Sequence, residues 1–372
     1  MKKFIFSCLV GILLFCPASG KCLESPEGRR GLFVSVIQDP PVLSSRAGIL
    51  RLVDFAKKAR VRILFVQIYR ANKAWFPSQV GDPGPYQRCL VQVSEDSFGL
   101  LIKEAHASGI EVHAWLNLLS LSANEDAPIL KKYGPGILTC NLNKKTILQD
   151  YKIDSQYFLE PGDPRVRYEL LKMIGEILRA YPKLDGLQFD YIRYPDKNPF
   201  YGYTPINLGR FKKATGRQTA DEADTVWKNW RRDQVTGLLG LLVKKARSIR
   251  PNIQVSTTGL TTYSRAYNEA FQDWKLWLKS GLVNFVTLMC YSRDTREFER
   301  YIHNAVNEVG DLKRMNIALG AYKLVDSPEI FKQEFEICKS SDSRGCVVLH
   351  YGNLLQNPAL ANPLLDKEKN TP

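Results

Sequence analysis

Short apolar runs alternate with longer amphipathic segments along most of the chain. Strands buried on both faces are short and apolar, whereas amphipathic helices repeat apolar residues every three to four positions. Runs of the first kind predict strands at residues 31–36, 62–69, 110–118, 184–191, 253–258, 283–291, 317–322 and 345–351. Segments of the second kind predict helices at residues 44–59, 97–108, 164–180, 223–249 and 270–279.

Eight strands that alternate with helices are typical of a (β/α)8 TIM barrel, and we predict this α/β fold for residues 21–352. The last helix is short or missing, because only about twenty residues follow the eighth strand, and residues 353–372 form a C-terminal tail. A doubly wound open sheet is the alternative. No glycine-rich GxGxxG or GxxxxGKS/T loop follows any strand, so nucleotide binding is not expected.

Residues 1–20 have the pattern of a secretory signal peptide. Lys2 and Lys3 precede an apolar stretch at residues 4–15, and small residues lead to a cleavage site near Gly20. That stretch is shorter than the roughly 20 residues that cross a bilayer, and no other apolar run approaches this length. We therefore predict a secreted or periplasmic protein with no integral membrane segment after signal removal. An uncleaved anchor is the alternative.

The chain is basic, with 52 Lys and Arg against 38 Asp and Glu. Removal of Lys2 and Lys3 with the signal peptide lowers the net charge from +14 to +12. A positive exported protein suits an anionic partner such as a cell-wall polymer, because the summed charge steers encounters. The alternative is that the charge serves solubility. No basic run is interleaved with aromatic residues, so a nucleic-acid partner is not predicted.

Cysteine and histidine usage bears on disulfides and metals. An exported protein can pair its cysteines, and Cys338 and Cys346 are the favoured local pair. Cys290 lies in an apolar strand and is predicted to be a buried thiol. The six cysteines beyond residue 20 form no CxxC motif, and the four histidines contain no pair three to five positions apart. Neither a metal site nor a cofactor is therefore predicted.

Strand alternation predicts which side chains point into the barrel. The chemistry of TIM barrels lies at the C-terminal ends of their strands, and side chains two positions apart share a face. The residues expected to face inward near the strand ends are Gln67, Tyr69, His113, Trp115, Asn117, Gln188 and Asp190. Inward polar groups are costly unless they are paired or solvated, so this set favours a solvated pocket over a dry core.

The segment DYIRYP at residues 190–195 carries the strongest candidate. Asp190 closes a buried strand, and Arg193 follows three residues later, where its guanidinium could hold the carboxylate ionised. We interpret Asp190 as a catalytic or sugar-binding carboxylate that Arg193 orients. An Asp–Arg pair that braces the loop is the structural alternative.

The chain resembles the glycosyl-hydrolase-like 10 family over most of residues 30–352. The segments that carry the resemblance are RGLFV (30–34), VHAWLN (112–117), FLEPGDPRVR (158–167), DYIRYP (190–195), WKNWRR (227–232) and QDWKLWL (272–278). The resemblance implies an exported TIM-barrel hydrolase that cleaves glycans, and some relatives are thought to act on bacterial cell-wall glycan.

The chain departs from the fourth-strand motif of barrel chitinases, D-G-x-D-x-D-x-E. Ile192 stands at the position of the acidic Glu, and Gln188 at that of the inner Asp. Because glycoside cleavage usually needs two carboxylates, the partner of Asp190 must come from elsewhere. Our candidates are Asp294 and Glu269. Asp294 has an alternative role as the N-cap of a helix at residues 295–309.

The sequence thus predicts an exported glycoside hydrolase that acts on a bacterial polysaccharide, with cell-wall glycan as one candidate. The substrate contacts are expected from aromatic and polar side chains at the strand ends, where rings stack on sugar faces. They comprise Gln67, Tyr69, His113, Trp115, Asn117, Gln188, Tyr191, Arg193 and Tyr291. One alternative is a catalytically inactive glycan-binding barrel. Another is a metal-dependent polysaccharide deacetylase, which the histidine spacing disfavours.

Overall fold

The computed structural model describes residues 29–146, 156–196 and 201–365. The predicted signal peptide at residues 1–20, together with Cys22, lies outside the described residues. None of the helices in the described ranges is long and apolar enough to cross a membrane.

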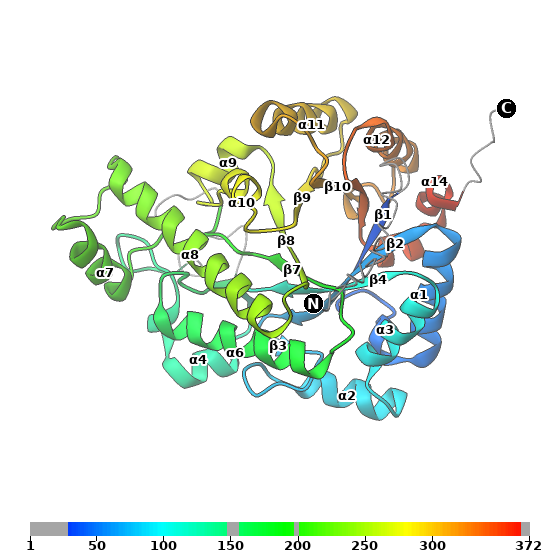
Figure 1. The fold of residues 1–372 in the computed structure, drawn as a ribbon, viewed down its shortest axis with the longest axis horizontal. Coiled ribbons are helices and arrows are strands. Elements are labelled where there is room, and N and C mark those ends of the chain that lie inside the picture. Colours follow the sequence, from blue (N-terminus) through cyan, green and yellow to red (C-terminus); the bar gives the residue numbers. More distant parts are fainter. Residues whose placement is uncertain (1–28, 147–155, 197–200, 366–372) are drawn as a thin grey trace, which may run out of the picture.

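In the described part of the chain, eight parallel strands close into a barrel (Figure 1). They are β1 (Arg30–Val34), β2 (Val61–Arg70), β4 (Glu111–Asn117), β7 (Gly186–Asp190), β8 (Gln254–Leu260), β9 (Phe285–Met289), β10 (Met315–Gly320) and β11 (Gly345–Leu349). The first strand closes the ring, because β1 pairs with both β2 and β11. The predicted (β/α)8 TIM barrel is therefore confirmed, and each of the eight strands lies where the apolar runs predicted one.

Helices surround the strands on the outside of the barrel (Figure 1). They are α1 (Arg46–Lys58), α2 (Gly84–Val93), α3 (Ser97–Ala107), α4 (Pro128–Tyr133), α6 (Pro164–Ala180), α7 (Pro205–Thr215), α8 (Thr225–Ile249), α9 (Tyr263–Asn268), α10 (Trp274–Lys279), α11 (Thr295–Val309), α12 (Pro328–Ser340), α13 (Tyr351–Gln356) and α14 (Asn362–Leu365). Shorter strands lie in the loops. The strand β3 (Lys73–Ala74) pairs antiparallel with the end of β2, and β5 (Ser120–Ser122) pairs antiparallel with β6 (Tyr157–Phe158).

Strand alternation separates two apolar layers. On β7, Leu187 and Phe189 are fully buried in the large cluster between the strands and the helices. A second cluster fills the barrel interior and consists of Phe33, Phe65, Trp115, Phe285, Ala318 and Val347. Gln188, which lies between Leu187 and Phe189, therefore faces the interior. Asp190 is two positions further along and ends this strand on the same inner face.

Short polar side chains start the helices that follow the strands. Asp96 begins α3 by accepting a hydrogen bond from the backbone N–H of Gly99 at 2.8 Å. Asp163 does the same for α6 through Arg165, also at 2.8 Å. Such caps satisfy N–H groups that the helix itself leaves unpaired, which explains why the helices begin at these residues.

The C-terminal region is more ordered than the predicted tail. The last helix of the barrel is short, as expected, because α13 spans only Tyr351–Gln356. Residues 353–365 nevertheless pack on the barrel, with Leu354, Leu360 and Leu364 buried. Arg30 ties this region to β1 by donating to the carbonyl oxygen of Leu364 at 2.7 Å. The leucines that recur in this part of the sequence were the feature from which this packing could have been predicted.

The cysteines follow the sequence-based expectations. Cys338 in α12 and Cys346 in β11 form a disulfide, which confirms the favoured local pair. Cys290 is a fully buried free thiol, as predicted, and Cys89 and Cys140 are buried thiols as well.

The glycine that begins β7 is required by the packing of the barrel interior. A Cβ atom at residue 186 would overlap the imidazole ring of His113. We expect Gly186→Ala to lower the free energy of unfolding by about 1–3 kcal/mol in urea titrations, because the ring has no room to move. The matched control is Gly209→Ala in α7, where a Cβ meets no atom within 4 Å. That change should stabilise the protein slightly through helix propensity, and equal effects of the two substitutions would contradict the packing argument.

Candidate active site

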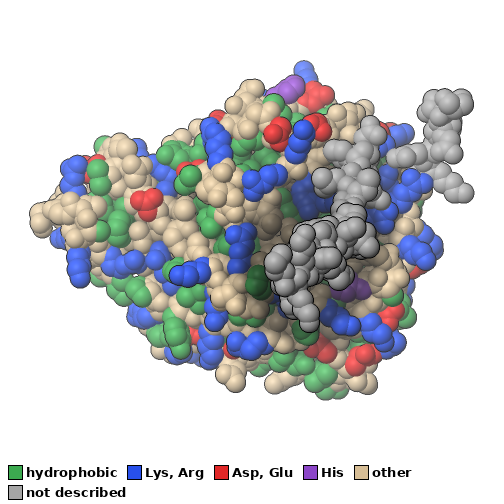
Figure 2. Space-filling model, in the orientation of Figure 1, with side chains coloured by type: hydrophobic (Ala, Val, Ile, Leu, Met, Phe, Trp, Pro, Cys, Tyr) green, Lys and Arg blue, Asp and Glu red, His purple; other side chains and the backbone are tan. Residues whose placement is uncertain are grey.

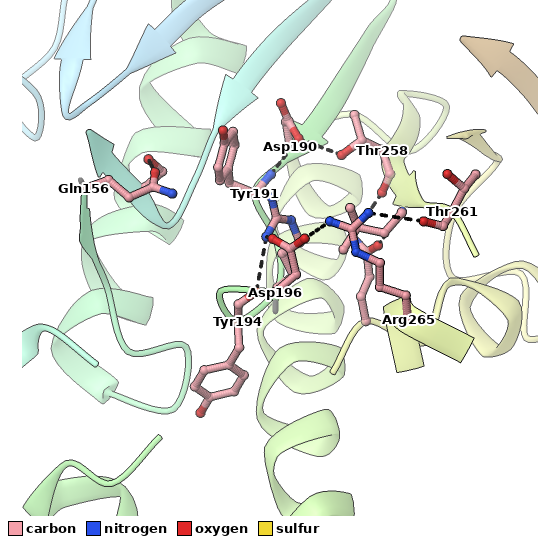
Figure 3. Close-up of polar contacts among 12 residues, drawn as sticks. Gln156, Asp190, Tyr191, Tyr194, Asp196, Thr258, Thr261 and Arg265 are labelled. Carbon is pink, nitrogen blue, oxygen red and sulfur yellow. Dashed lines mark hydrogen bonds and ion pairs between the residues drawn. The ribbon is translucent and has the colours of Figure 1, made fainter. Parts of the chain in front are cut away.

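Asp190 lies at the mouth of the barrel, which is the end where the parallel strands terminate. Its side chain is held by groups from the two neighbouring strands, and Figure 3 shows the contact with Thr258 of β8. Oδ1 accepts from the Thr258 hydroxyl of β8 at 2.7 Å and from the backbone N–H of Tyr191 at 2.8 Å. Oδ2 accepts from the indole Nε1–H of Trp115 in β4 at 3.0 Å. Asp190 is only 6% exposed, so these contacts replace most of its hydration.

The donor set matches a side chain that accepts hydrogen bonds at both carboxyl oxygens. An indole N–H and a backbone N–H can only donate, so each carboxylate oxygen faces a group that cannot accept a proton in return. Hydrogen bonds of this charge-assisted kind are stronger than those between neutral groups. The geometry therefore suits an anion that attacks, accepts a proton or stabilises positive charge, rather than an acid that donates a proton.

Two tyrosines flank this carboxylate. Tyr191 adopts the left-handed backbone conformation, with φ of 52°, and its backbone N–H donates to Asp190. Tyr291 lies two residues after the end of β9, and its ring centre lies 5.6 Å from that of Tyr322. Burial, and then the charge of Asp190, raise the pKa of Tyr291 well above its usual value. Its hydroxyl therefore keeps its proton close to an anion.

A layer of buried polar side chains lies beside and below Asp190. Gln67 donates to Asn117 Oδ1 at 3.1 Å and accepts from the Ser35 hydroxyl at 3.1 Å. Gln188, one inward position below Asp190, accepts a hydrogen bond from the Ser256 hydroxyl. The predicted inward faces of Gln67, Asn117 and Gln188 are thus confirmed, although their burial makes them supports for the site rather than open surface.

The predicted ion pair between Asp190 and Arg193 is wrong. Arg193 instead donates to Asp196 Oδ1 at 2.9 Å, and the other oxygen of Asp196 binds Arg265 (Figure 3). The turn at Tyr191 ends the strand, so the two-residue alternation no longer relates Arg193 to Asp190. Burial alone would raise the pKa of Asp196, but the two guanidiniums outweigh it and hold that pKa below its usual range.

Arg193 still borders the site through Tyr191. Its guanidinium lies over the Tyr191 ring, 4.9 Å from the ring centre. It therefore braces the loop after β7, in line with the structural alternative, although its partner is Asp196.

His113 does not reach the mouth of the barrel, contrary to the prediction. It is fully buried one layer below Trp115, and its ring lies 5.5 Å from that of Phe65 and 5.9 Å from that of Phe285. Burial lowers its pKa more than the neighbouring Glu111 raises it. His113 is therefore a core histidine, because the inward face of β4 is deep enough for Trp115 to cover it.

Tyr69 is also placed differently from the prediction. An irregularity in the pairing with β4 falls between Gln67 and Tyr69, so Gln67 pairs with Trp115 while Tyr69 pairs with Leu116. This bulge turns Tyr69 into the outer apolar layer, where its hydroxyl accepts from Asn72 at 2.7 Å.

Asp294 has a local structural role, and Glu269 lies at the end of α9. Asp294 caps α11 and accepts from the N–H groups of Arg296 at 2.8 Å and Glu297 at 3.2 Å. These N–H groups hold the pKa of Asp294 below its usual range. Glu269 is half-buried at the end of α9. Within the described ranges, no hydrogen bond links either residue to Asp190, so the second carboxylate stays a prediction.

Sequence reasoning missed Thr258 and Ser256, which support the carboxylate and its layer. The signal was present in β8, since Ser256 and Thr258 lie two positions apart and therefore share one face of the strand. The pair of Asp196 and Arg265 had no comparable signal, because the residues are 69 positions apart. Among the described residues, no group of three or more His, Cys, Asp and Glu side chains could hold a metal ion.

Comparison with known proteins now places the chain in a family. The family model described as Glycosyl hydrolase-like 10 matches residues 43–334. The chain belongs to this family. Glycosyl hydrolase DigH of Escherichia coli (strain K12) is 24% identical over 317 residues, which cover 75% of this chain and 69% of DigH. Glycosyl hydrolase YngK of Bacillus subtilis (strain 168) is 22% identical over 325 residues, covering 78% of this chain and 59% of YngK.

Solved structures agree on the fold. The catalytic domain of β-amylase from Paenibacillus polymyxa superposes with a TM-score of 0.59 over 90% of this chain and 95% of that domain. The two share 10% sequence identity, so this likeness concerns the barrel itself. The family resemblance drawn from the sequence motifs is confirmed by the family model alone.

The hydroxyl of Thr258 offers a direct test of how Asp190 is held. Thr258→Val removes one donor to a buried anion at nearly constant volume, and such hydrogen bonds contribute about 1.5–3 kcal/mol. We expect kcat/KM on a cleaved glycan to fall roughly 10- to 100-fold. The control is Thr257→Val on the opposite face of β8, where the buried hydroxyl has no hydrogen-bond partner among the described residues. Equal activity losses in both variants would contradict the role of Thr258.

Proposed function

We propose that this protein hydrolyses glycosidic bonds of a polysaccharide, with Asp190 as the catalytic carboxylate. The observation that carries the proposal is the fixed position of Asp190 at the barrel mouth, where donors from β4, β7 and β8 converge on it. Membership of the glycosyl hydrolase-like 10 family supports the reaction class. TIM barrels place their chemistry at this same end of the strands.

Glycoside hydrolysis requires an acid for the leaving oxygen as well as a nucleophile or base. The contacts of Asp190 assign it to the anionic role, because its oxygens face donors. In that role it stabilises the positive charge that develops on the sugar, and it either attacks the anomeric carbon or activates water. Glu269 is the candidate for the acid, because the cap contacts that hold the pKa of Asp294 below its usual range suit an anion rather than a proton donor. Tyr291 can donate a hydrogen bond to substrate or to Asp190.

The proposed substrate is a bacterial polysaccharide, with cell-wall glycan as the favoured candidate, and the proposed location is secreted or periplasmic. The sequence pattern of residues 1–20 supports export, and the net charge supports an anionic polymer. Lys and Arg side chains are spread over the whole visible face in Figure 2 and outnumber the acidic ones. This distribution favours general attraction to a polyanion over a single basic patch.

A glycan-binding barrel without turnover is the second candidate. The observation that favours it is the absence, among the described residues, of a second carboxylate hydrogen-bonded within the Asp190 network. The two candidates differ in one measurable property, which is the release of new reducing ends.

Asp190→Asn should keep the fold and abolish turnover. The amide is nearly isosteric but lacks the charge, so we expect kcat to fall on the order of 10³-fold or more. Release of reducing ends from peptide-free cell-wall glycan, chitin and starch measures both the activity and its substrate.

The control for this substitution is Asp185→Asn, which changes a carboxylate that precedes β7 at the opposite end of the barrel. Asp185 accepts from the backbone N–H of Val112 at 2.7 Å, so its loss should affect stability and leave kcat nearly unchanged. Near-normal activity of folded Asp190→Asn would contradict the assignment. Binding of glycans without product from any substrate would favour the second candidate.

Salt dependence tests the anionic substrate. Charges separated by more than about 8 Å are screened at physiological ionic strength. The initial rate on an anionic glycan should therefore fall as salt rises from low to physiological levels, while the rate on a neutral oligosaccharide should stay nearly flat. An equal salt response on both substrates would mean that the positive charge serves solubility.

A further inference from the structure

A polar cavity of about 190 Å³ lies at the end of the barrel opposite Asp190. Its charged and polar lining comes from Arg29, Arg62, Glu111, Asn316 and Arg344. Arg29 and Arg344 immediately precede β1 and β11, and the others stand at the first or second position of their strands. Asp190 is the last residue of β7, so the length of the parallel barrel separates this cavity from the candidate active site.

Positive charge dominates the lining. Three arginines line the cavity, and the only acidic residue among the described residues of its lining is Glu111. The Glu111 side chain is half exposed, and its Oε2 lies 3.8 Å from Nε2 of the buried His113. The arginines therefore keep an excess of about two positive charges around a small space.

The position of Arg344 shows that this charge is held in place. Its guanidinium lies over the ring of Phe285, 4.1 Å from the ring centre, at the base of the barrel interior. Burial, and then repulsion by Arg29, lower the pKa of Arg344 to about 10. Gly31 contributes no side chain to the lining, and a Cβ there would come within 2.9 Å of Val347. The protein thus holds several positively charged arginines around one cavity, and a bound anion would neutralise their mutual repulsion.

Size and geometry define the anion. Pockets for drug-sized ligands have volumes of about 300–1,000 Å³, so 190 Å³ suits one small ion with water. Guanidinium groups present paired N–H donors that match the oxygens of phosphate-type anions. We propose that this cavity binds a single small tetrahedral oxyanion, inorganic phosphate or sulfate, through Arg29, Arg62 and Arg344. The site is independent of the proposed hydrolase activity.

The test is calorimetric titration of the purified protein with inorganic phosphate and with sulfate, in chloride buffers of matched ionic strength. We expect saturable binding of one anion per chain. Arg344→Gln should weaken this binding at least tenfold, because it removes the half-buried guanidinium that Phe285 holds in place. Arg62→Gln should weaken it several-fold, and its exposed position makes the substitution safe for folding.

The matched control is Arg296→Gln, which removes an arginine whose side chain is 91% exposed on α11. This variant should bind phosphate as the wild type does. An equal loss of affinity in Arg296→Gln would show that binding follows net charge and would overturn the proposal. Unchanged affinity in both Arg344→Gln and Arg62→Gln, or no binding at millimolar phosphate, would overturn it as well.

Discussion

The burial of one carboxylate depends on the register of three barrel strands. Asp190 is 6% exposed, and an unpaired buried charge is costly. The pairing of β4, β7 and β8 brings Trp115 and Thr258 to either side of it, and the turn at Tyr191 adds a backbone donor. A register shift in either neighbouring strand would remove a donor and leave the charge uncompensated. The register of these three strands therefore fixes the position of the Asp190 carboxylate at the mouth of the barrel.

Much of the fold was predictable because it rests on local periodicity. The barrel strands are short segments rich in apolar residues, and the short last helix followed from the number of residues left after the eighth strand. Asp190, Asn117 and Gln188 were placed correctly because strict alternation holds along β4 and β7. The disulfide between Cys338 and Cys346 was predictable from proximity along the chain, since eight positions separate them.

The errors arose where local periodicity breaks. The bulge before Tyr69 reverses the direction of its side chain, and no single residue in the β2 sequence predicts this bulge. His113 faces the barrel interior, as alternation predicts, but it lies too deep to reach the barrel mouth. Alternation predicts which face of the strand a side chain occupies and not how far it lies from the mouth. Arg193 follows a left-handed turn that ends the strand, and its true partner, Asp196, is shared with Arg265 from a distant helix. Contacts of this last kind depend on the closure of the barrel and leave no local signal.

The two ends of the barrel carry opposite chemistry. At the mouth, a buried anion is surrounded by donors and aromatic rings, which suits a reaction that develops positive charge on a sugar. At the other end, three arginines surround a small cavity. The apolar interior cluster and His113 separate the two ends, so each can be altered without loss of the other.

The central claim, that Asp190 acts on substrate as an anion, is tested most directly by chemical rescue. Asp190→Ala removes the carboxylate and leaves space at the barrel mouth that a small anion can enter. We predict that azide or formate restores a substantial part of the lost turnover of glycan in this variant, in proportion to the anion concentration, while leaving the wild type unaffected. A folded Asp190→Ala variant that is inactive at every concentration of azide and formate, while the wild type cleaves the same glycan, would contradict the account.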